Sequence, residues 1–414
     1  VRGEVERLIA AAGVVAGAAV RIELAEDLAA RAMDRCLPLL DRDGVPEHIR
    51  AWTSRPVLAV EAELTARLAA RARTGGPETD LTPPVDLAAG AARLDAGQAA
   101  AVAALAGDRP LAVVEGAAGA GKTTTLAATR NVLDQQGRRL VVVTPTLKAA
   151  KVAAAEVGAV AGSAARLAFQ HGWRWNNDGA WTRLGIGDLC PTTGGVYAGP
   201  GEGARLRPGD LLVVDEAGML DQDTARALLT VADECRVRVA LLGDRHQLAA
   251  VGRGGVLDLA AAQVDLTGHL TLDGVHRFTR TDATGATTPD SDYAELTLAM
   301  RAGENPGTVF DTLLARGQIR LHPDAQALRK ELAATAAQCY TAGERVAVVV
   351  AIREQAAALN AAIRDRLVTD GRVDDRRVVV TGAGERIGVG DRIATRRNDR
   401  DLQVANRDVW TVTG

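Results

Sequence analysis

The sequence has few cysteines and no long apolar run, and these absences exclude several classes of protein. The four cysteines among its 414 residues form no CxxC pair and have no histidine at metal-ligand spacing; they are Cys36, Cys190, Cys235 and Cys339. We therefore interpret them as small buried residues in a reducing compartment. No charge-free run of about 18 apolar residues and no basic segment before an apolar N-terminal core occur, which argues against a membrane span and a signal peptide. These absences predict a cytoplasmic protein without a membrane partner.

The chain also lacks a strong charge of either sign. Its net charge is −3 with 24% charged residues, so composition neither indicates nor excludes nucleic acid, because a small net charge can hide a basic channel. Hydrophobic residues make up 47%, as in a soluble protein with a sizeable core, and the length suits roughly two to four domains. The sequence begins at Val1 and ends at Gly414, directly after the strand-like VWTV, so we expect a piece of a longer polypeptide.

Residues 1–92 are predicted to form an N-terminal helical region and a linker. Apolar residues recur at helical spacing in VEAELTARLAARA (60–72), which indicates an amphipathic helix. The Gly and Pro residues of TGGPETDLTPP (74–84) then mark a boundary.

Residues 93–270 are predicted to form a doubly wound α/β domain. Four short Val/Leu runs alternate with helical stretches: LAVVEG (111–116), RLVVVTP (139–145), DLLVVDE (210–216) and VRVALLGD (237–244). Such near-continuous apolar runs are typical of parallel strands that are buried on both faces. The helical stretches would supply the crossover connections.

Residues 271–414 are predicted to form a second, incomplete α/β domain. Its clearest unit is a strand RVAVVVA (345–351) that leads into a helix over 353–367. From about residue 376 the sequence is rich in strand and turn residues, which predicts a small β module inserted near the C-terminus.

Three of the five tryptophans lie in HGWRWNNDGAWTRLG (171–185). Trp173 and Trp175 alternate before an Asn-Asp-Gly turn and Trp181 follows it, which predicts a β-hairpin in an insertion over about 171–207. Cross-strand aromatic pairing would explain this pattern. The alternative is a base-stacking platform or a wedge at the point of strand separation, with Trp173 and Trp181 as DNA-binding residues.

The strongest motif is GAAGAGKT (116–123), between the strand LAVVEG and a helix that starts TTLAATR. It matches G-x-x-x-x-G-K-[ST], in which backbone N–H groups and a helix N-terminus surround phosphate oxygens. Lys122 would neutralise the β- and γ-phosphates of ATP and Thr123 would bind Mg²⁺; the alternative is a Gly-rich turn with an incidental lysine. The candidate ATP-binding residues here are Gly116, Ala117, Ala118, Gly119, Ala120, Gly121, Lys122, Thr123 and Thr124.

A second motif, VVDEAGM (213–219), places two carboxylates at the end of an apolar strand. We expect Asp215 to hold the Mg²⁺ shell and Glu216 to orient or deprotonate the attacking water. A helix N-cap would explain an isolated Asp-Glu pair equally well, but the upstream phosphate loop favours the catalytic interpretation.

A third motif, LLGDRHQLAAVGRGG (241–255), also follows a strand. Its Asp244 and Gln247 are expected at the carboxyl edge of the sheet, where α/β folds bind ligands. A neutral glutamine there can contact both the γ-phosphate and the attacking water. A polar surface loop is the alternative.

Five motifs in this order resemble those of superfamily 1 helicases of the RecD-like branch, most of all the helicase part of conjugative relaxases. They are GAAGAGKT, TPTLKAAK (144–151), VVDEAGM, GDRHQL and LDGVHRF (272–278). The resemblance covers about residues 50–414 and is most specific over 94–278. It implies two RecA-like P-loop NTPase domains, ATP and Mg²⁺ as cofactors, 5′-to-3′ stepping along single-stranded DNA, and conjugation or relaxosome proteins as further partners.

The same resemblance implies further residue roles. Gln98 falls where these helicases read the adenine base, although it could be an exposed helix residue. Arg277 falls where the family places an arginine that reaches the γ-phosphate from the second domain, although it could be a surface cation beside an aromatic ring. The segment expected to touch single-stranded DNA contributes Thr144, Thr146 and Lys148, of which Lys148 could equally be a solvated helix charge.

The sequence departs from the family pattern in three places. Ala249 stands where proline is common, no HKxQG-like or ALTRA-like segment occurs, and the six histidines form no His-x-His cluster. We therefore expect the 414 residues to bind ATP–Mg²⁺ with weak, poorly DNA-stimulated turnover and no strand separation. The competing functions are a nucleic-acid scaffold with little turnover and a P-loop small-molecule kinase. The Asp-Glu pair, GDRHQL and Arg277 argue against the kinase.

Overall fold

The computed structural model describes residues 1–38, 52–73, 94–176, 179–191, 193–250, 252–282, 284–382, 384–396, 399, 402 and 404–413. These residues form two compact units, Val1–Ala294 and Glu295–Gly414, and each is described here by itself. The predicted linker at 74–84 lies outside the described residues.

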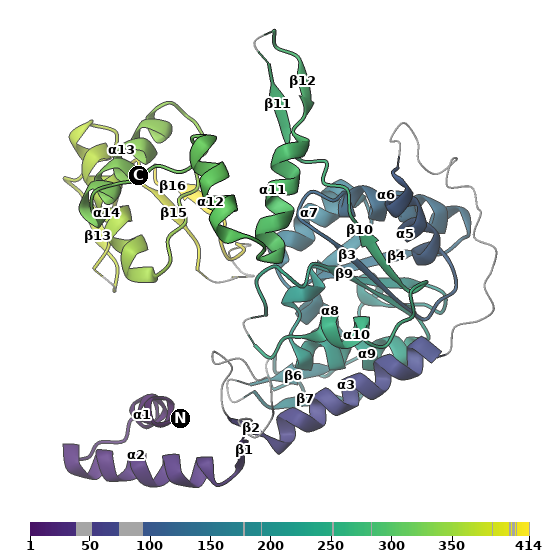
Figure 1. Cartoon of the computed structure of the whole chain (residues 1–414). Coiled ribbons are helices and arrows are strands. Elements are labelled where there is room, and N and C mark those ends of the chain that lie inside the picture. Colours follow the sequence, from purple (N-terminus) through teal and green to yellow (C-terminus); the bar gives the residue numbers. More distant parts are fainter. Residues whose placement is uncertain are drawn as a thin grey trace. The chain divides into compact units, whose positions relative to one another are not determined.

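The first unit is built on a six-stranded parallel sheet with the strand order β10-β3-β9-β8-β4-β5 (Figure 1). All four predicted Val/Leu runs are strands of this sheet, so the doubly wound fold is confirmed. The strands are β3 (Leu111–Gly116), β4 (Leu140–Thr144), β5 (Val160–Ser163), β8 (Leu211–Asp215), β9 (Arg238–Gly243) and β10 (His269–Leu272).

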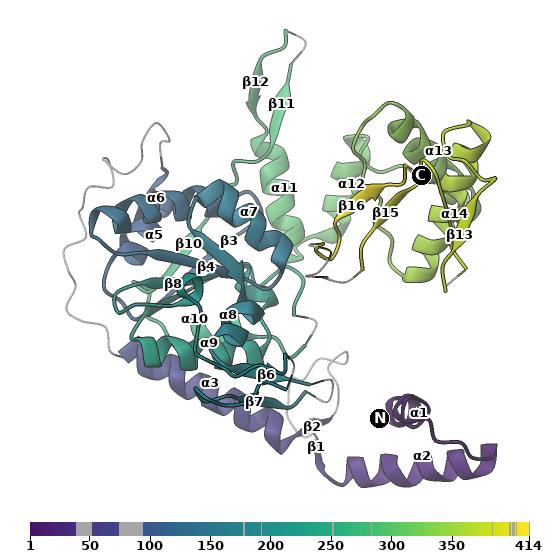
Figure 2. The same ribbon diagram turned by 180° about the vertical axis from the view of Figure 1, so that it is seen from behind.

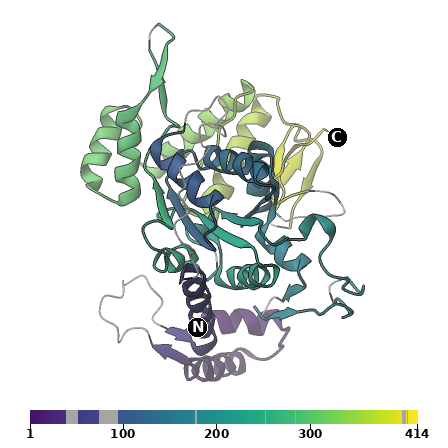
Figure 3. The ribbon, with the colours of Figure 1, turned by 90° about the vertical axis from the view of Figure 1, so that its right-hand side faces the viewer.

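Helices cover both faces of the sheet, because alternate apolar side chains along each strand point to opposite faces. One face packs against α5 (Ala96–Ala106), α6 (Lys122–Gln135) and α7 (Leu147–Val157). The other packs against α3 (Arg55–Arg73), α8 (Ala164–Gln170), α9 (Gln222–Cys235) and α10 (Val256–Ala261). Figure 2 shows these two layers from behind and Figure 3 shows them from the side.

Helix α3 is part of the core of this unit. Leu64 and Leu68 are fully buried in the same apolar cluster as the strand residue Val113. Arg71 holds the helix in place, because its guanidinium donates to the carboxylate of Asp233 on α9 and to the carbonyl of Val237. The core thus extends N-terminal to the boundary that the sequence placed at residue 93.

The strand order brings the ends of four strands together. Because β10, β3, β9 and β8 are parallel neighbours, their carboxyl ends meet at one edge of the sheet. The phosphate loop, the Asp-Glu pair, the GDRHQL loop and the LDGVHRF segment each follow one of these strands. Ligands of open α/β sheets bind at such an edge, where the chain leaves neighbouring strands in different directions.

The N-terminal region is helical, as predicted. It contains α1 (Arg2–Ala11) and α2 (Ala18–Met33), followed by a short antiparallel pair, β1 (Cys36–Pro38) with β2 (Trp52–Ser54). Among the described helices of the whole chain, none combines the length and the apolar character that a membrane crossing requires.

The predicted tryptophan hairpin is present. β6 (Trp173–Trp175) pairs with β7 (Trp181–Arg183) in antiparallel register, and Trp175 lies opposite Trp181. The insertion also contains a short 3₁₀ helix, η1 (Glu202–Ala204), and another, η2 (Ala217–Met219), follows β8. A second hairpin, β11 (Thr279–Thr281) with β12 (Thr287–Pro289), precedes α11 (Ser291–Ala302).

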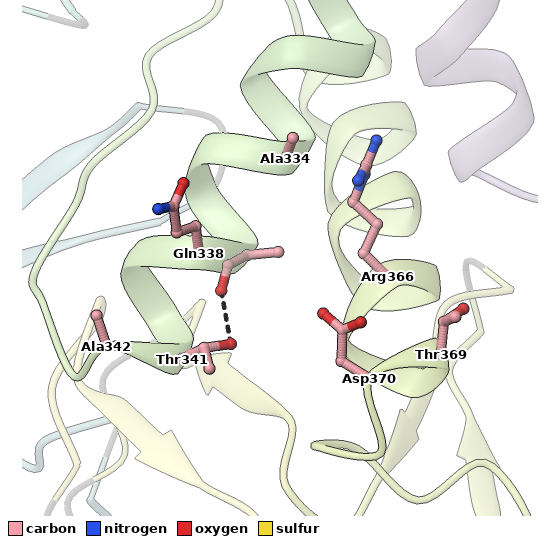
Figure 4. Close-up of a pocket in the computed structure, with 8 residues that line it drawn as sticks. Ala334, Gln338, Thr341, Ala342, Arg366, Thr369 and Asp370 are labelled. Atoms are coloured by element: carbon pink, nitrogen blue, oxygen red, sulfur yellow. Dashed lines mark hydrogen bonds between the residues drawn. The ribbon is translucent and has the colours of Figure 1, made fainter.

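The second unit is helical with antiparallel strand pairs. It contains α12 (Pro306–Ala315), α13 (Ala325–Thr341) and α14 (Arg353–Thr369), and the pairs β13 (Val378–Val380) with β14 (Arg386–Gly388) and β15 (Arg392–Ala394) with β16 (Val409–Thr411). The predicted helix at 353–367 and the β-rich tail are thus confirmed. A cavity between α13 and α14 is lined by alanine and threonine side chains together with Gln338, Arg366 and Asp370 (Figure 4).

The prediction of a strand over 345–351 was wrong. These residues form no strand, and Val349 is 90% exposed. An apolar segment becomes a strand only where a neighbouring strand takes its backbone hydrogen bonds, and no described strand of this unit pairs with it. The parallel sheet expected for a second RecA-like domain is therefore not among the described residues of the second unit.

The cysteine prediction holds only in part. Cys190 is buried, whereas Cys36, Cys235 and Cys339 are half-buried, and all four are free thiols.

The packing of α3 gives a stability prediction. Leu64→Ala should lower the free energy of unfolding by about 2–5 kcal/mol, because it leaves a cavity between the helix and the sheet. Leu266→Ala, at a side chain that is 90% exposed, is the control and should change it by less than about 0.5 kcal/mol. Urea unfolding measures both variants. An equally small change in the free energy of unfolding for Leu64→Ala and Leu266→Ala would show that α3 does not belong to this core.

Candidate nucleotide-binding site

The phosphate loop connects β3 to α6, and its glycines are required by both conformation and space. Gly119 and Gly121 have φ values of 90° and 81°, in the left-handed region that side chains other than glycine rarely adopt. A Cβ atom at Gly119 would lie 2.6 Å from the Cβ of Arg277, and one at Gly121 would lie 2.1 Å from Nε2 of Gln98. The two glycines thus let other segments pack directly on the loop.

The loop presents donors to an anion. Helix α6 starts at Lys122 with no side-chain cap, so its first backbone N–H groups remain available for a ligand. Nζ of Lys122 donates to the carbonyls of Gly116 (2.8 Å) and Ala117 (3.4 Å), which holds the ammonium group against the loop. Thr123 and Thr124 are exposed in the first turn of the helix. This cradle of backbone donors with one cation fits phosphate groups.

Two carboxylates lie at the end of β8. Oδ1 of Asp215 accepts a hydrogen bond of 2.9 Å from the backbone N–H of Glu216. Burial, together with the negative charge of Glu216, raises the pKa of Asp215 to about 6, although Lys122 opposes this shift. A bound divalent cation would stabilise the charged form, so the donor set fits Mg²⁺. Glu216 has a φ of 57°, and such backbone strain in a residue other than glycine is frequent at functional sites.

The GDRHQL loop follows β9 and packs against the Asp-Glu motif. Asp244 is buried, and its carboxylate accepts hydrogen bonds from the backbone N–H of His246 (3.0 Å) and from Nε2 of Gln247 (3.3 Å). A Cβ atom at Gly218 would lie 2.8 Å from the carbonyl oxygen of Asp244, so the two motifs approach closely. Asp244 therefore shapes the loop, and Gln247 is one of its exposed polar residues, with Arg245 and His246.

Gln98 lies next to the phosphate loop but is buried. Its side chain caps α5, because Oε1 accepts from the backbone N–H of Asp95 (3.1 Å). Nε2 donates to the carbonyl of Ala120 (3.4 Å), within the loop. Gln98 thus links the start of α5 to the loop, and contact with adenine stays a prediction.

Arg277 also lies against the loop, and it comes from the first unit. The backbone N–H of His276 donates to the carbonyl of Gly119 (2.9 Å), and its ring contacts the carboxylate of Asp95 (2.9 Å). Burial raises the pKa of Asp95, but hydrogen bonds from Gln98 and His276 outweigh it and lower the pKa. The expectation that Arg277 reaches over from a second domain is therefore corrected: it follows β10, which completes the first sheet.

The predicted DNA-contacting segment lies at the carboxyl end of β4. Thr146 and Lys148 are exposed, and Thr146 caps α7 by accepting from the backbone N–H of Ala149 (3.2 Å). Thr144 is buried, and its hydroxyl donates to the carbonyl of Thr146 (2.6 Å). Thr144 therefore supports the turn, and of the three predicted contact residues Thr146 and Lys148 are exposed.

The tryptophans of the hairpin have different environments. Trp175 is 43% exposed and stacks on Trp181, with ring centroids 4.7 Å apart. Trp173 packs against the core, and the guanidinium groups of Arg183 and Arg226 lie 5.6 and 5.9 Å from the centre of its ring. The two tryptophans predicted to bind DNA, Trp173 and Trp181, thus have different environments. Trp173 packs on the core and anchors the hairpin, whereas Trp181 stacks on the exposed Trp175.

Sequence reasoning missed a buried charged group beside the site. Glu115, on β3 directly before the phosphate loop, pairs with Arg245 of the GDRHQL loop and with His269 on β10. The available signal was a lone acidic residue in an otherwise apolar strand.

The raised pKa of Asp215 gives a pH prediction. The carboxyl group of Asp215 keeps its proton to a higher pH in the folded chain than in the unfolded chain, from 3.8 up to about 6. The contribution of Asp215 to the free energy of unfolding therefore falls as pH rises through that window. Without divalent cations, Asp215→Asn should therefore gain stability over the wild type across this window, on the order of 1–3 kcal/mol by neutral pH. Urea unfolding at several pH values measures this gain, with Glu202→Gln as the exposed control. A gain that does not depend on pH would contradict the prediction.

The comparisons with known proteins agree with these motifs. A model of the AAA domain family matches residues 93–324. The probable conjugal transfer protein TraA of Sinorhizobium fredii is 26% identical over 368 residues, which cover 86% of this chain and 28% of that protein. The conjugal transfer protein TraA of Agrobacterium fabrum is 27% identical over 316 residues, or 76% of this chain and 25% of that protein. The chain thus spans about a quarter of the length of these relatives.

Two solved helicase structures are more distant. A structure of two coordinating Pif1 helicases at forked double-stranded DNA has 17% identity and a TM-score of 0.38, over 78% of this chain and 71% of that one. The PRRSV helicase has 23% identity and a TM-score of 0.23, over 43% and 33%. Likeness at this level adds nothing to the assignment. Because the family model matches more than half of the chain, the chain belongs to the AAA domain family, and its motifs resemble those of RecD-like superfamily 1 helicases.

Proposed function

We propose that this chain is the ATP-hydrolysing core of a DNA helicase or translocase that acts on single-stranded DNA, within the helicase portion of a conjugative relaxase. The observation that carries the proposal is the meeting of four motif loops at one edge of a parallel sheet. One loop supplies a phosphate cradle with Lys122, the next supplies Asp215 and Glu216, and the third supplies Gln247. The fourth places Arg277 on the cradle.

Each side chain has a role that its position supports. Lys122 and the N-terminus of α6 would hold the phosphates and neutralise their charge. Glu216 would orient the attacking water, and Gln247 would contact both this water and the γ-phosphate. When bound beside Asp215 and Thr123, Mg²⁺ supplies the positive charge that offsets charge on the transferred phosphoryl group. Arg277 would stabilise the same charge.

Single-stranded DNA is the proposed substrate of the motor. Thr146 and Lys148 are exposed at the carboxyl end of β4, on the same edge of the sheet as the phosphate loop. A hydroxyl group and an ammonium group there suit contacts to phosphate oxygens. The relatives are conjugal transfer proteins, so we propose that conjugation proteins are further partners.

The ATPase site can be tested directly. Lys122→Ala should lower ATP hydrolysis by about 100-fold or more, because it removes the cation from the phosphate cradle. Lys330→Ala, in the second unit, is the matched lysine control and should hydrolyse ATP like the wild type. Phosphate release is measured with and without oligo(dT).

The outcomes separate the functional classes. Hydrolysis that rises on addition of oligo(dT), even by a small factor, supports a motor. DNA binding without hydrolysis supports a scaffold, and turnover that does not change at all with DNA supports a kinase. An unchanged rate of ATP hydrolysis in Lys122→Ala would contradict the assignment of this loop as the ATP-binding site.

The hairpin gives a second test, with two tryptophans as each other's control. If the exposed stack binds bases, Trp175→Ala should lose about 1–3 kcal/mol of oligo(dT) affinity at little cost to folding. Trp173→Ala should mainly lower the free energy of unfolding, because Trp173 packs on the core. Affinity should fall with salt, with a log–log slope of about −0.7 per neutralised phosphate. Unchanged affinity in Trp175→Ala would leave the stack a purely structural feature.

A further inference from the structure

Glu115 is a charged residue in a position that otherwise requires an apolar one. Its side chain is only 7% exposed, at the next-to-last residue of β3, and every other residue of this strand is apolar or glycine. An unpaired carboxylate at such a position would cost considerable free energy, so burial of this charge depends on its partners.

Two side chains from neighbouring segments, Arg245 and His269, contact this carboxylate. Nε of Arg245 donates to Oε2 (2.9 Å) and Oε1 (3.1 Å) of Glu115, and Nη2 of Arg245 makes a further close contact with Oε1. Nε2 of His269 lies 3.0 Å from Oε1. The partners come from the loop after β9 and from β10, the two strands that flank β3.

The contacts keep the carboxylate of Glu115 in its charged form. Burial alone would raise the pKa of Glu115, but hydrogen bonding and the charge of Arg245, with a contribution from His269, hold the pKa below its ordinary value. Arg245 also lies 3.6 Å from the carboxylate of Asp258 on α10. Its guanidinium is thus fixed between β3 and α10.

The ion pair connects two of the motifs. Glu115 directly precedes Gly116, whose carbonyl accepts from Nζ of Lys122. Arg245 lies between Asp244, which shapes its loop by hydrogen bonds, and Gln247. A movement of the GDRHQL loop relative to the phosphate loop would therefore have to break the pair.

We propose that the Glu115–Arg245 ion pair is a positioning device that fixes Gln247 relative to the phosphate loop and so sets the rate of ATP hydrolysis. This inference rests on the proposed ATPase function. Neither residue reaches the phosphates in this role: both act through the loop that carries Gln247. The effect of breaking the pair should therefore fall on kcat, whereas KM for ATP should depend on the phosphate loop itself.

The test uses Arg245→Met, Glu115→Gln and the double variant, with kcat and KM for ATP measured at saturating oligo(dT). Each single variant should lower kcat by about 10- to 100-fold with KM within about threefold of the wild type. The double variant should lose no more than the worse single variant, because the two residues act as one unit. Arg245→Lys should recover part of the loss.

A matched control ion pair lies at the amino ends of the strands of the same sheet. Arg139 and Asp210, which precede β4 and β8, form an ion pair with similar burial: the side chains are 34% and 4% exposed, against 33% and 7% for Arg245 and Glu115. Arg139→Met should lose stability in urea to a similar degree but keep its kcat. This control separates positioning from general weakening of the fold.

The outcomes distinguish the inference from the function on which it rests. If the wild type hydrolyses ATP and Arg245→Met keeps its kcat, or Arg139→Met loses as much, the positioning role is overturned and the proposed function stands. If the wild type does not hydrolyse ATP with or without oligo(dT), the proposed function fails and the inference fails with it.

Discussion

The parallel alignment of neighbouring strands is the constraint on which the rest of this structure depends. A parallel sheet carries all its carboxyl ends on one edge, and the order β10-β3-β9-β8 places four motif loops side by side there. The motifs are separated by up to about 150 residues in sequence, yet Gly119 contacts the segment around Arg277, and Gly218 contacts Asp244. Glycine at these positions allows the loops to approach to backbone distance. The local sequence determines the conformation of each loop, and the strand order of the sheet brings the loops together into one site.

The site contains two neighbouring carboxylates whose mutual repulsion a bound cation would reduce. Asp215 is half-buried next to another carboxylate, and Glu216 has a left-handed backbone conformation. Two other charged groups of the unit have partners of opposite charge: Arg71 pairs with Asp233, and Glu115 pairs with Arg245. These pairs stabilise the fold, whereas the two neighbouring carboxylates Asp215 and Glu216 carry like charges that fit a cation. The fold carries the cost of Asp215 because the surrounding core, which includes α3, is extensive.

Much of the first unit could be predicted from the sequence, because buried parallel strands such as β3 and β8 are continuous apolar runs with little helical character. The same signal failed at residues 345–351, because an apolar run says nothing about whether a neighbouring strand is there to pair with it. Roles assigned by resemblance named the segments but not the exposure of their side chains: Thr144 and Gln98 are buried. The sequence also could not show that Glu115 and Arg245 meet, since 130 residues separate them.

The most direct measurement is an experimental structure of this chain with Mg²⁺, a non-hydrolysable ATP analogue and oligo(dT). We predict that the triphosphate lies in the loop before α6, with Lys122 on its terminal phosphates, the metal held by Thr123 and Asp215, and Gln247 facing the γ-phosphate. We also predict that the Glu115–Arg245 pair is intact. A nucleotide bound elsewhere, for example between α13 and α14, or a triphosphate without contact to Lys122, would contradict this proposal.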